Sequence, residues 1–194
     1  MNKFNKEFWT KRYQDNEAGW DLGTISTPLK EYIDQLTDKN LRILIPGAGN
    51  AHEAEYLFHK GFTDVTVIDI SELPLQNIQE RLPNFPKENL ILADFFEHQS
   101  SYDLIIEQTF FCALDRSLRE QYVAKMQDLL KPKGKLVGLL FTDPIDTDLP
   151  PFGAKQEEYI NLFNSGFEFK TFEESVNSIK PRMGRELFIN FVKK

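Results

Sequence analysis

Two glycines and one carboxylate have the spacing that most clearly suggests chemistry. Gly47 and Gly49 follow the apolar run 41–45, at a point where glycine lets the backbone turn sharply and approach a bound molecule closely. Asp69 ends the next apolar run about 20 residues later, where a carboxylate accepts hydrogen bonds from both hydroxyls of a ribose. Taken alone, the glycines also suit a plain tight turn, and the acid suits a helix cap. Taken together, they predict a site for a ligand that contains adenosine.

The residues after the glycines indicate which adenosine compound is bound. A nicotinamide dinucleotide site uses a third glycine, which allows close packing of helix and strand and brings the pyrophosphate to the helix N-terminus. His52 stands at that third position, and Glu53 follows it. A carboxylate there repels a pyrophosphate, whereas a cationic sulfonium tolerates acids and aromatic rings. The pattern therefore favours S-adenosylmethionine, whose demethylated product is S-adenosylhomocysteine.

Another acid and an aromatic residue follow a third apolar run. Asp94 closes the run 89–94, and Phe95 comes directly after it. At the end of a parallel strand, such an acid contacts the edge of an adenine and such a ring lies against its face. A hydrophobic corner with a capping acid would have the same residues. We expect Asp94 and Phe95 to belong to the adenosine site.

The elements that must position these residues alternate in type. Short apolar runs are separated by amphipathic stretches, as in a succession of β-α-β units, and the runs are apolar throughout, as in a sheet covered on both faces. Five strands are predicted, at 41–45, 64–70, 89–94, 102–107 and 135–141. Two further strand-like runs close the chain, at 167–172 and 186–192. We predict an α/β, Rossmann-like fold with a mostly parallel seven-stranded sheet, a C-terminal antiparallel hairpin and helices on both faces.

Helical patterns fit before, between and after these strands. They are predicted at 4–14, 28–36, 51–60, 72–82, 116–131 and 157–163. Gly61 and the segment 131–134 supply stop signals for two of them. The sequence has no internal repeat, and 194 residues suffice for one core. We therefore expect a single domain over residues 1–194.

The composition narrows the class of partner. The net charge is −7 and no cluster of Lys and Arg occurs, so the basic stripe that a nucleic-acid partner requires is missing. The apolar runs are shorter than the roughly 20 residues that cross a bilayer, and the first ten residues lack the apolar segment of a secretory signal. The single cysteine, Cys112, indicates a reducing compartment. We expect a cytoplasmic protein, a monomer or weak dimer, that acts on a small molecule without a metal, a membrane or a nucleic acid.

Five short motifs resemble one family in their order and spacing. The resemblance is to the thiopurine S-methyltransferase family, and within it to the branch of plant thiol and halide methyltransferases known as harmless-to-ozone-layer proteins. It extends to the segment 181–186. The motifs are Trp20-Asp21-Leu22-Gly23, Pro46-Gly47-Ala48-Gly49, Ile68-Asp69-Ile70-Ser71, Ala93-Asp94-Phe95-Phe96 and Thr109-Phe110-Phe111-Cys112-Ala113-Leu114. The resemblance implies a class I S-adenosylmethionine-dependent methyltransferase fold.

The resemblance also implies a set of cofactor-binding residues. Residues 1–30 would form an aromatic lid over the cofactor. Tyr13, Ala48 and Gln108 stand where relatives often have Trp, Cys and Tyr, and Asn50-Ala51 replaces a more glycine-rich stretch. The implied residues are Trp9, Tyr13, Trp20, Gly47, Gly49, Asp69, Asp94, Phe95 and Gln108. Independently of the family, Trp9 also suits packing of its helix onto the sheet, and Trp20 a structural loop.

The acceptor side is less defined by the sequence. Methyl transfer from a sulfonium is an in-line displacement that needs aligned, desolvated reactants and little acid–base chemistry. Phe110, Phe111 and Phe152 are candidates for the wall of an acceptor pocket, or equally for packing. Arg182 and Arg185 are candidates for attracting an anionic acceptor and its thiolate form, or for plain surface charge. We expect Cys112 to be a buried packing residue and not a nucleophile.

Rival functions and several properties stay open at this point. A non-catalytic nucleotide-sensing module would use the same fold, and a nicotinamide dehydrogenase is a more distant alternative. A nucleic-acid methyltransferase is disfavoured because the segment 107–110 lacks the Asn/Asp-Pro-Pro-aromatic arrangement for extruded bases. Hydrosulfide, thiocyanate, halide, and small organic or aromatic thiols all fit as acceptors. The sequence does not choose among them.

Overall fold

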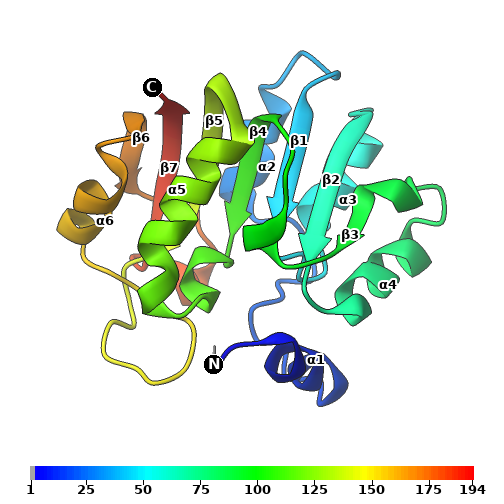
Figure 1. The fold of residues 1–194 in the computed structure, drawn as a ribbon, viewed down its shortest axis with the longest axis horizontal. Coiled ribbons are helices and arrows are strands. Elements are labelled where there is room, and N and C mark those ends of the chain that lie inside the picture. The colour runs from blue at the N-terminus through cyan, green and yellow to red at the C-terminus, as the bar shows by residue number, and fades with distance from the viewer. Residues whose placement is uncertain (1–2) are drawn as a thin grey trace. The chain divides into compact units, whose positions relative to one another are not determined.

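In a computed structural model that describes residues 3–194, three parallel strands form the sheet of the first of two units, which runs up to His98. The strands are β1 (Arg42–Pro46), β2 (Asp64–Asp69) and β3 (Leu90–Leu92), in the order β3-β2-β1 (Figure 1). Ile45 is paired with Val67, and Asp69 with Leu92. Because parallel strands end at one edge, the residues after β1, β2 and β3 meet there.

Four α-helices accompany these strands in residues 3–98, the described part of the first unit. They are α1 (Lys6–Gln14), α2 (Thr27–Asp34), α3 (His52–His59) and α4 (Glu72–Arg81). The Asn5 side chain caps α1 by accepting a hydrogen bond from the amide of Phe8 at 3.0 Å. Leu57 of α3 and Ile78 of α4 are fully buried. Both helices therefore present apolar side chains to a core, as their sequence pattern predicts.

Four strands form the sheet of the second unit, from Gln99 to Lys194. The order is β4-β5-β7-β6, with the first pair parallel and the others antiparallel. The strands are β4 (Tyr102–Gln108), β5 (Leu130–Phe141), β6 (Phe167–Glu174) and β7 (Glu186–Lys193), and the helices are α5 (Arg119–Leu129) and α6 (Gln156–Phe163) (Figure 1). Phe141 is paired with Glu186, which brings the end of β5 to the start of β7.

Aromatic rings fill the core of the second unit. Phe111 lies 4.9 Å from Tyr122 and 5.6 Å from Tyr159, measured between ring centroids, and Phe163 lies 5.3 Å from Phe191. All five side chains are almost completely buried. Each ring removes a large apolar area from water, and edge-to-face contacts add to that stabilisation. Many of the 17 phenylalanines are thus core residues.

The predicted strand at 135–141 begins earlier than its apolar pattern suggests. β5 starts at Leu130, which is paired with Tyr102, and the next pair is Leu104 with Lys135. The four residues between bulge out of the register, and Lys133 adopts a φ of 63°. Their Lys-Pro-Lys-Gly sequence is a typical stop signal for a helix, so the sequence predicted the end of a helix where the structure continues a strand.

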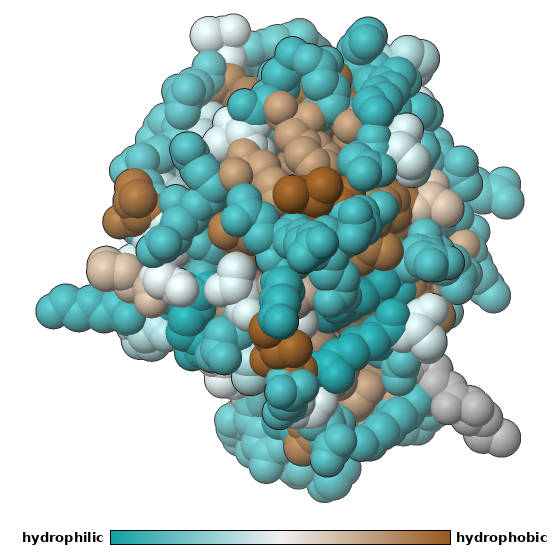
Figure 2. Space-filling model, turned by 90° about the vertical axis from the view of Figure 1, so that its left-hand side faces the viewer, coloured by the Kyte–Doolittle hydropathy of each residue, from teal (hydrophilic) through white to brown (hydrophobic). Residues whose placement is uncertain are grey.

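The surface is largely hydrophilic where Figure 2 shows it, and apolar side chains lie between the hydrophilic ones in smaller groups. Among residues 3–194, no helix is long and apolar enough to cross a membrane. Over the same residues, no three His, Cys, Asp or Glu side chains are grouped as ligands for a metal ion.

Candidate functional site

The loop after β1 adopts backbone conformations that favour glycine. Gly47 has a φ of 66° and Gly49 a φ of 53°, both in the left-handed region. The amide of Gly47 donates a 2.8 Å hydrogen bond to the carbonyl of Ile68 in β2. Ala51 also has a positive φ, 45°, directly before α3. The glycine pair therefore shapes a sharp turn at the ends of β1 and β2.

Asp69 lies against this glycine loop. Its side chain is 9% exposed and accepts a 2.7 Å hydrogen bond from the amide of Ser71. Burial raises the pKa of Asp69 to about 6, although hydrogen bonds from backbone amides, including those of Ala48 and Gly49, act to lower it. The two features that the sequence linked by spacing are thus adjacent in the structure.

The aromatic residues of the N-terminal segment gather at the same loop. Trp20 lies 5.6 Å from Trp9 and 5.4 Å from Tyr13 between ring centroids, in both cases edge to face. The indole nitrogen of Trp20 is 3.7 Å from where a Cβ on Gly49 would stand. Burial raises the pKa of Tyr13, and the nearby charge of Asp69 raises it further. All three aromatic side chains are half-buried.

A hydroxyl contact joins α1 to the residues that follow Asp69. The side-chain oxygens of Thr10 and Ser71 are 2.9 Å apart. Helix α1 therefore sits at the end of β2, with Trp9 and Tyr13 on it. Of the lid predicted over residues 1–30, residues 1 and 2 lie outside the described part of the chain.

Asp94 and Phe95 follow β3 at the same edge of the first unit's sheet. The amide of Ala93 donates a 3.0 Å hydrogen bond to the carbonyl of Asp69. The carboxylate of Asp94 is exposed and accepts a 2.8 Å hydrogen bond from the amide of Phe96, which caps the short helix Phe95–Glu97. The ring of Phe95 is buried. The local contacts thus include the capping role expected of such an acid.

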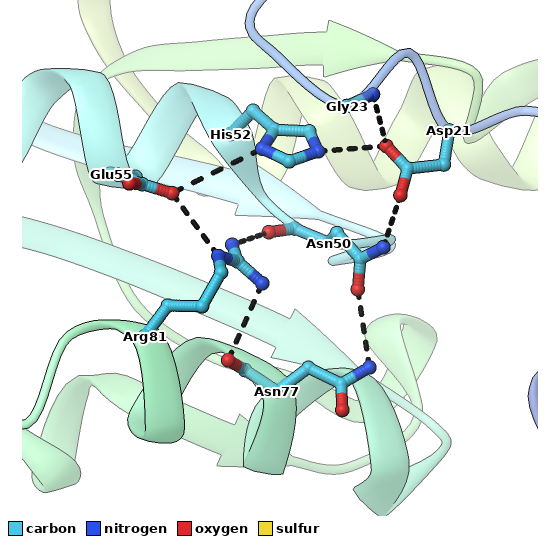
Figure 3. A network of polar contacts seen from close by, with 7 residues as sticks. All are labelled: Asp21, Gly23, Asn50, His52, Glu55, Asn77 and Arg81. Carbon is cyan, nitrogen blue, oxygen red and sulfur yellow. Dashed lines mark hydrogen bonds and ion pairs between the residues drawn. The ribbon is translucent and has the colours of Figure 1, made fainter.

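A polar network that sequence reasoning missed surrounds Asn50 (Figure 3). Both carboxylate oxygens of Asp21 have hydrogen-bond partners. One oxygen accepts a hydrogen bond from Asn50 Nδ2. The other lies 2.7 Å from His52 Nε2 and 2.8 Å from the amide nitrogen of Gly23. Although burial raises the pKa of Asp21, its hydrogen bonds from Gly23, Asn50 and His52 lower it below its ordinary value. The sequence signal was His52 in place of a third glycine, together with Asp21 beside Trp20.

In the second unit, a buried carboxylate shapes the turn after β4. Glu107 has no exposed surface, and its Oε1 accepts hydrogen bonds from the amides of Phe110 at 2.8 Å and Phe111 at 2.9 Å. Burial raises the pKa of Glu107 to about 7, although these bonds and one from Tyr122 lower it. Thr109 adopts a φ of 60° inside the turn. Glu107 was also missed, although an acid in an apolar strand is an unusual residue.

The three rings predicted for the acceptor side differ in burial. Phe110 is half-buried, whereas Phe111 and Phe152 are almost fully buried. The amide of Phe152 donates a 2.7 Å hydrogen bond to the carbonyl of Cys112, which joins its loop to the turn after β4. Burial raises the pKa of the Cys112 thiol, as expected for a packing residue.

Two arginines that the sequence did not single out contact these rings. The guanidinium carbon of Arg116 is 4.9 Å from the ring centroid of Phe152, and that of Arg119 is 5.1 Å from that of Phe111. Arg119 also donates hydrogen bonds to the carbonyls of Phe152 at 3.0 Å and Gly153 at 3.1 Å. The loop that carries Phe152 is therefore held by the buried Arg119 and by the exposed Arg116.

Arg182 and Arg185 both lie near Phe141 and both have carboxylate partners. Arg182 is 7% exposed and 3.4 Å from Glu186, and Arg185 Nε is 3.1 Å from Asp143. Their guanidinium carbons are 5.4 Å and 5.9 Å from the Phe141 ring centroid. The structure brings the two predicted arginines together, with part of their charge already neutralised.

Comparisons with known sequences place these features in context. Residues 4–189 match the family described as thiopurine S-methyltransferase (TPMT). The chain is 30% identical to probable thiol methyltransferase 2 of Arabidopsis thaliana, over 96% of this chain and 84% of that one. It is 29% identical to thiocyanate methyltransferase 1 of Brassica oleracea (92% and 81%), and 24% identical to thiopurine S-methyltransferase of Acinetobacter baylyi (92% and 92%).

Solved structures share the fold at lower identity. A Burkholderia thailandensis 1,6-didemethyltoxoflavin-N1-methyltransferase, with bound 1,6-didemethyltoxoflavin and S-adenosylhomocysteine, has a TM-score of 0.78 at 15% identity, over 97% of this chain and 87% of that one. The glycopeptide N-methyltransferase MtfA, complexed with S-adenosylhomocysteine, has a TM-score of 0.69 at 13% identity, with both chains fully covered. The predicted Rossmann-like methyltransferase fold is confirmed.

Proposed function

Because the chain belongs to the thiopurine S-methyltransferase family, we propose that it transfers the methyl group of S-adenosylmethionine to a small thiol or to an anionic sulfur or halide acceptor. The family and the methyltransferase class predicted from the motifs are confirmed by the match. One observation carries the proposal for the cofactor. The Asp69 carboxylate, the glycine loop and the rings of Tyr13 and Trp20 are gathered in one place of the first unit.

The residues at this place fit a sulfonium compound of adenosine. The loop backbone is open because Gly47 and Gly49 carry no side chain, and Asp69 is an acceptor for ribose hydroxyls. The first turn of α3 contains Glu53 and Glu55, at the helix end where a pyrophosphate would otherwise bind. Aromatic rings and carboxylates suit a positive sulfur. The donor set therefore favours S-adenosylmethionine over a dinucleotide.

Each group of residues has a defined task in this proposal. The cofactor, when bound, would supply an electrophilic methyl carbon: a nucleophile would attack that carbon in line, the carbon–sulfur bond would break and S-adenosylhomocysteine would leave. Asp69 and the loop fix the sugar, and Asp94 and Phe95 hold the base. The rings of Trp9, Tyr13 and Trp20 exclude water from one side of the cofactor. Gln108, at the end of β4, is the remaining cofactor-binding residue of the proposal. No general base is needed for a thiol, because its ordinary pKa of about 8.5 leaves a few per cent ionised at neutral pH.

The acceptor class rests on the chemistry of the second unit. Phe110 offers a half-buried ring next to the buried Phe111 in the chain, and the buried Phe152 lies in the loop that is bonded to Cys112. Such apolar surfaces desolvate a soft nucleophile. Arg182 and Arg185 supply positive charge at the end of β5. Arginine near an acceptor favours its anionic form. The relatives named for thiol and thiocyanate methylation point to the same class of acceptor.

We propose that residues 1–194 act as one methyltransferase domain. The family match runs from residue 4 to residue 189 and so includes residues of both units. The proposal includes a monomer or weak dimer in the cytoplasm. The single, buried Cys112 agrees with a reducing compartment.

A methyl-transfer assay tests this function. The purified protein is incubated with S-adenosylmethionine and, one at a time, hydrosulfide, thiocyanate, iodide, a small organic thiol and an aromatic thiol. Formation of S-adenosylhomocysteine above the rate of an Asp69→Ala variant supports the proposal. Binding of S-adenosylmethionine without turnover on any of these acceptors would overturn it and favour a non-catalytic sensing module.

A further inference from the structure

Asn50, the residue after the glycine pair, joins three segments of the first unit (Figure 3). Its side-chain nitrogen donates to the Asp21 carboxylate, and its side-chain oxygen accepts a 3.2 Å hydrogen bond from Asn77 of α4. Its carbonyl accepts a hydrogen bond from Arg81. A glycine or alanine at position 50 has no side-chain nitrogen or oxygen to make the first two contacts. Asn50 is therefore a junction between the N-terminal segment, the glycine loop and α4.

His52, in the first turn of α3, also makes a hydrogen bond with the carboxylate of Asp21. Its Nε2 donates to Asp21 Oδ1 over 2.7 Å, and its other ring nitrogen lies 4.0 Å from Glu55. Arg81 pairs with the same Glu55 carboxylate at 3.2 Å. The histidine is thus oriented by an acid on each side. Both oxygens of Asp21 are occupied by partners from the segment 50–52.

Asp21 is the direct neighbour of Trp20 in the chain. Trp20 lies beside Gly49 of the glycine loop and packs edge to face against the rings of Trp9 and Tyr13. Fixing the Asp21 carboxylate therefore restricts where the Trp20 ring can go, because only one peptide unit separates the two side chains. Between α1 and α2 the described chain forms no helix or strand, and the amide of Asp21 donates a 2.9 Å hydrogen bond to the carbonyl of Ala18 within a turn.

We propose that Asn50 and His52 are positioning residues that bind Asp21 and so hold Trp20 against the glycine loop before the cofactor arrives. This inference rests on the proposed function for its effect on cofactor binding. A preformed ring surface lowers the ordering cost that binding would otherwise carry. Loss of the contacts therefore weakens binding without removing any group that touches the cofactor.

The position of Trp20 can be measured without any cofactor. In a Trp9→Phe background, Trp20 is the one remaining tryptophan, so its fluorescence and its quenching by acrylamide report its exposure. Asn50→Ala and Asp21→Asn should each increase quenching and speed hydrogen exchange in residues 15–25. Asp34→Asn is the matched control, because Asp34 also accepts hydrogen bonds in the first unit, from Lys30 and Tyr56, away from this network.

The second measurement is the affinity for S-adenosylhomocysteine, by calorimetry. Asn50→Ala and Asp21→Asn should each raise the Kd for S-adenosylhomocysteine about three- to tenfold, as expected for one or two lost hydrogen bonds. The variant with both substitutions should have a Kd close to that of either single variant, because both substitutions remove the same contact. Asp21→Asn keeps the shape of the side chain and serves if Asn50→Ala does not fold.

Unchanged quenching and exchange in both variants would overturn the inference. So would strictly additive effects of Asn50→Ala and Asp21→Asn on the Kd. If the unaltered protein itself fails to bind S-adenosylhomocysteine, the proposed function fails, while the quenching in the free protein still decides the position of Trp20.

Discussion

The hydroxyl of Tyr122 donates a 2.5 Å hydrogen bond to Oε2 of Glu107, and neither side chain has exposed surface. The other carboxylate oxygen accepts hydrogen bonds from two backbone amides of the turn after β4. Together these bonds fix a turn in which Thr109 has a positive φ, a conformation that costs free energy for a β-branched residue. Glu107 is therefore the anchor of the segment that carries Gln108 and Phe110.

The charge of Glu107 predicts a pH dependence of stability. Its pKa in the folded protein is raised to about 7, from an ordinary 4.5. A carboxyl group whose pKa is raised by folding stabilises the folded protein when the pH is below the unfolded-state pKa. This contribution to stability is lost as the pH rises through about 7. Glu107→Gln should therefore lower the pH dependence of the free energy of unfolding between pH 5 and pH 8 by about 1–3 kcal/mol. Urea unfolding at both pH values measures it.

A variant that removes the donor tests the same bond from the other side. Tyr122→Phe should reduce stability by about 1–2 kcal/mol, because a buried carboxylate loses one of its three hydrogen bonds, and should raise the pKa of Glu107 further. An identical pH profile in Glu107→Gln and the unaltered protein would show that other groups cause the dependence.

Asp69 predicts how cofactor affinity changes with pH. Its pKa is raised to about 6 by burial, and an ionised carboxylate is the stronger acceptor for ribose hydroxyls. The Kd for S-adenosylmethionine should rise about tenfold for each pH unit below 6, and Asp69→Ala should weaken binding more than about tenfold at pH 7.5. Calorimetry across this pH range measures both effects.

The control for Asp69 is an acid on the same strand. Asp64→Asn alters the first residue of β2, which pairs with Arg42 near the surface, and should leave the affinity unchanged. Equal affinity of Asp69→Ala and the unaltered protein would remove Asp69 from the ribose site.

Removal of the Trp20 ring should weaken the binding of S-adenosylmethionine and have little effect on the binding of the acceptor. Trp20→Ala removes the ring beside Gly49, so the KM for S-adenosylmethionine should rise by about tenfold or more while the KM for the acceptor changes little. Trp20→Phe keeps a ring and should recover part of the loss. An unaltered KM in Trp20→Ala would make this residue structural only.

The sequence predicted the parts that depend on local patterns. Alternating apolar runs placed the strands and helices, and strand ends brought Gly49 and Asp69 together because parallel strands finish at one edge. The start of β5 at Leu130 was missed because a bulge and a helix stop have similar residues. These features are set within a few residues of the chain.

Side-chain partners far apart in the chain were not predictable in this way. Asp21 and His52 are 31 residues apart, and no local pattern relates them. Glu107 was hidden because its partner Tyr122 comes from a helix. Arg182 was interpreted as a surface or acceptor residue because its buried partner Glu186 becomes evident only when the chain folds.

Arg182 and Arg185, the two arginines predicted for the acceptor side, have different ion-pair partners and should therefore have different roles. Glu186 is 2% exposed and also accepts a 2.6 Å hydrogen bond from Ser178. Arg182→Leu leaves this buried carboxylate without its cation, so it should lower stability by about 3 kcal/mol. Arg185 is half-exposed and pairs with the exposed Asp143. Arg185→Leu should therefore change stability by less than about 1 kcal/mol.

The kinetic effect of Arg185→Leu then reports on the acceptor. If Arg185 attracts an anion, the KM for thiocyanate should rise about tenfold while that for a neutral thiol stays within about twofold. Asp143→Asn frees the guanidinium from its partner and should have the opposite effect on the thiocyanate KM. Equal changes for both acceptors would assign Arg185 to the support of the loop at Asp143, since a charge that attracts an anion has no reason to act equally on a neutral molecule.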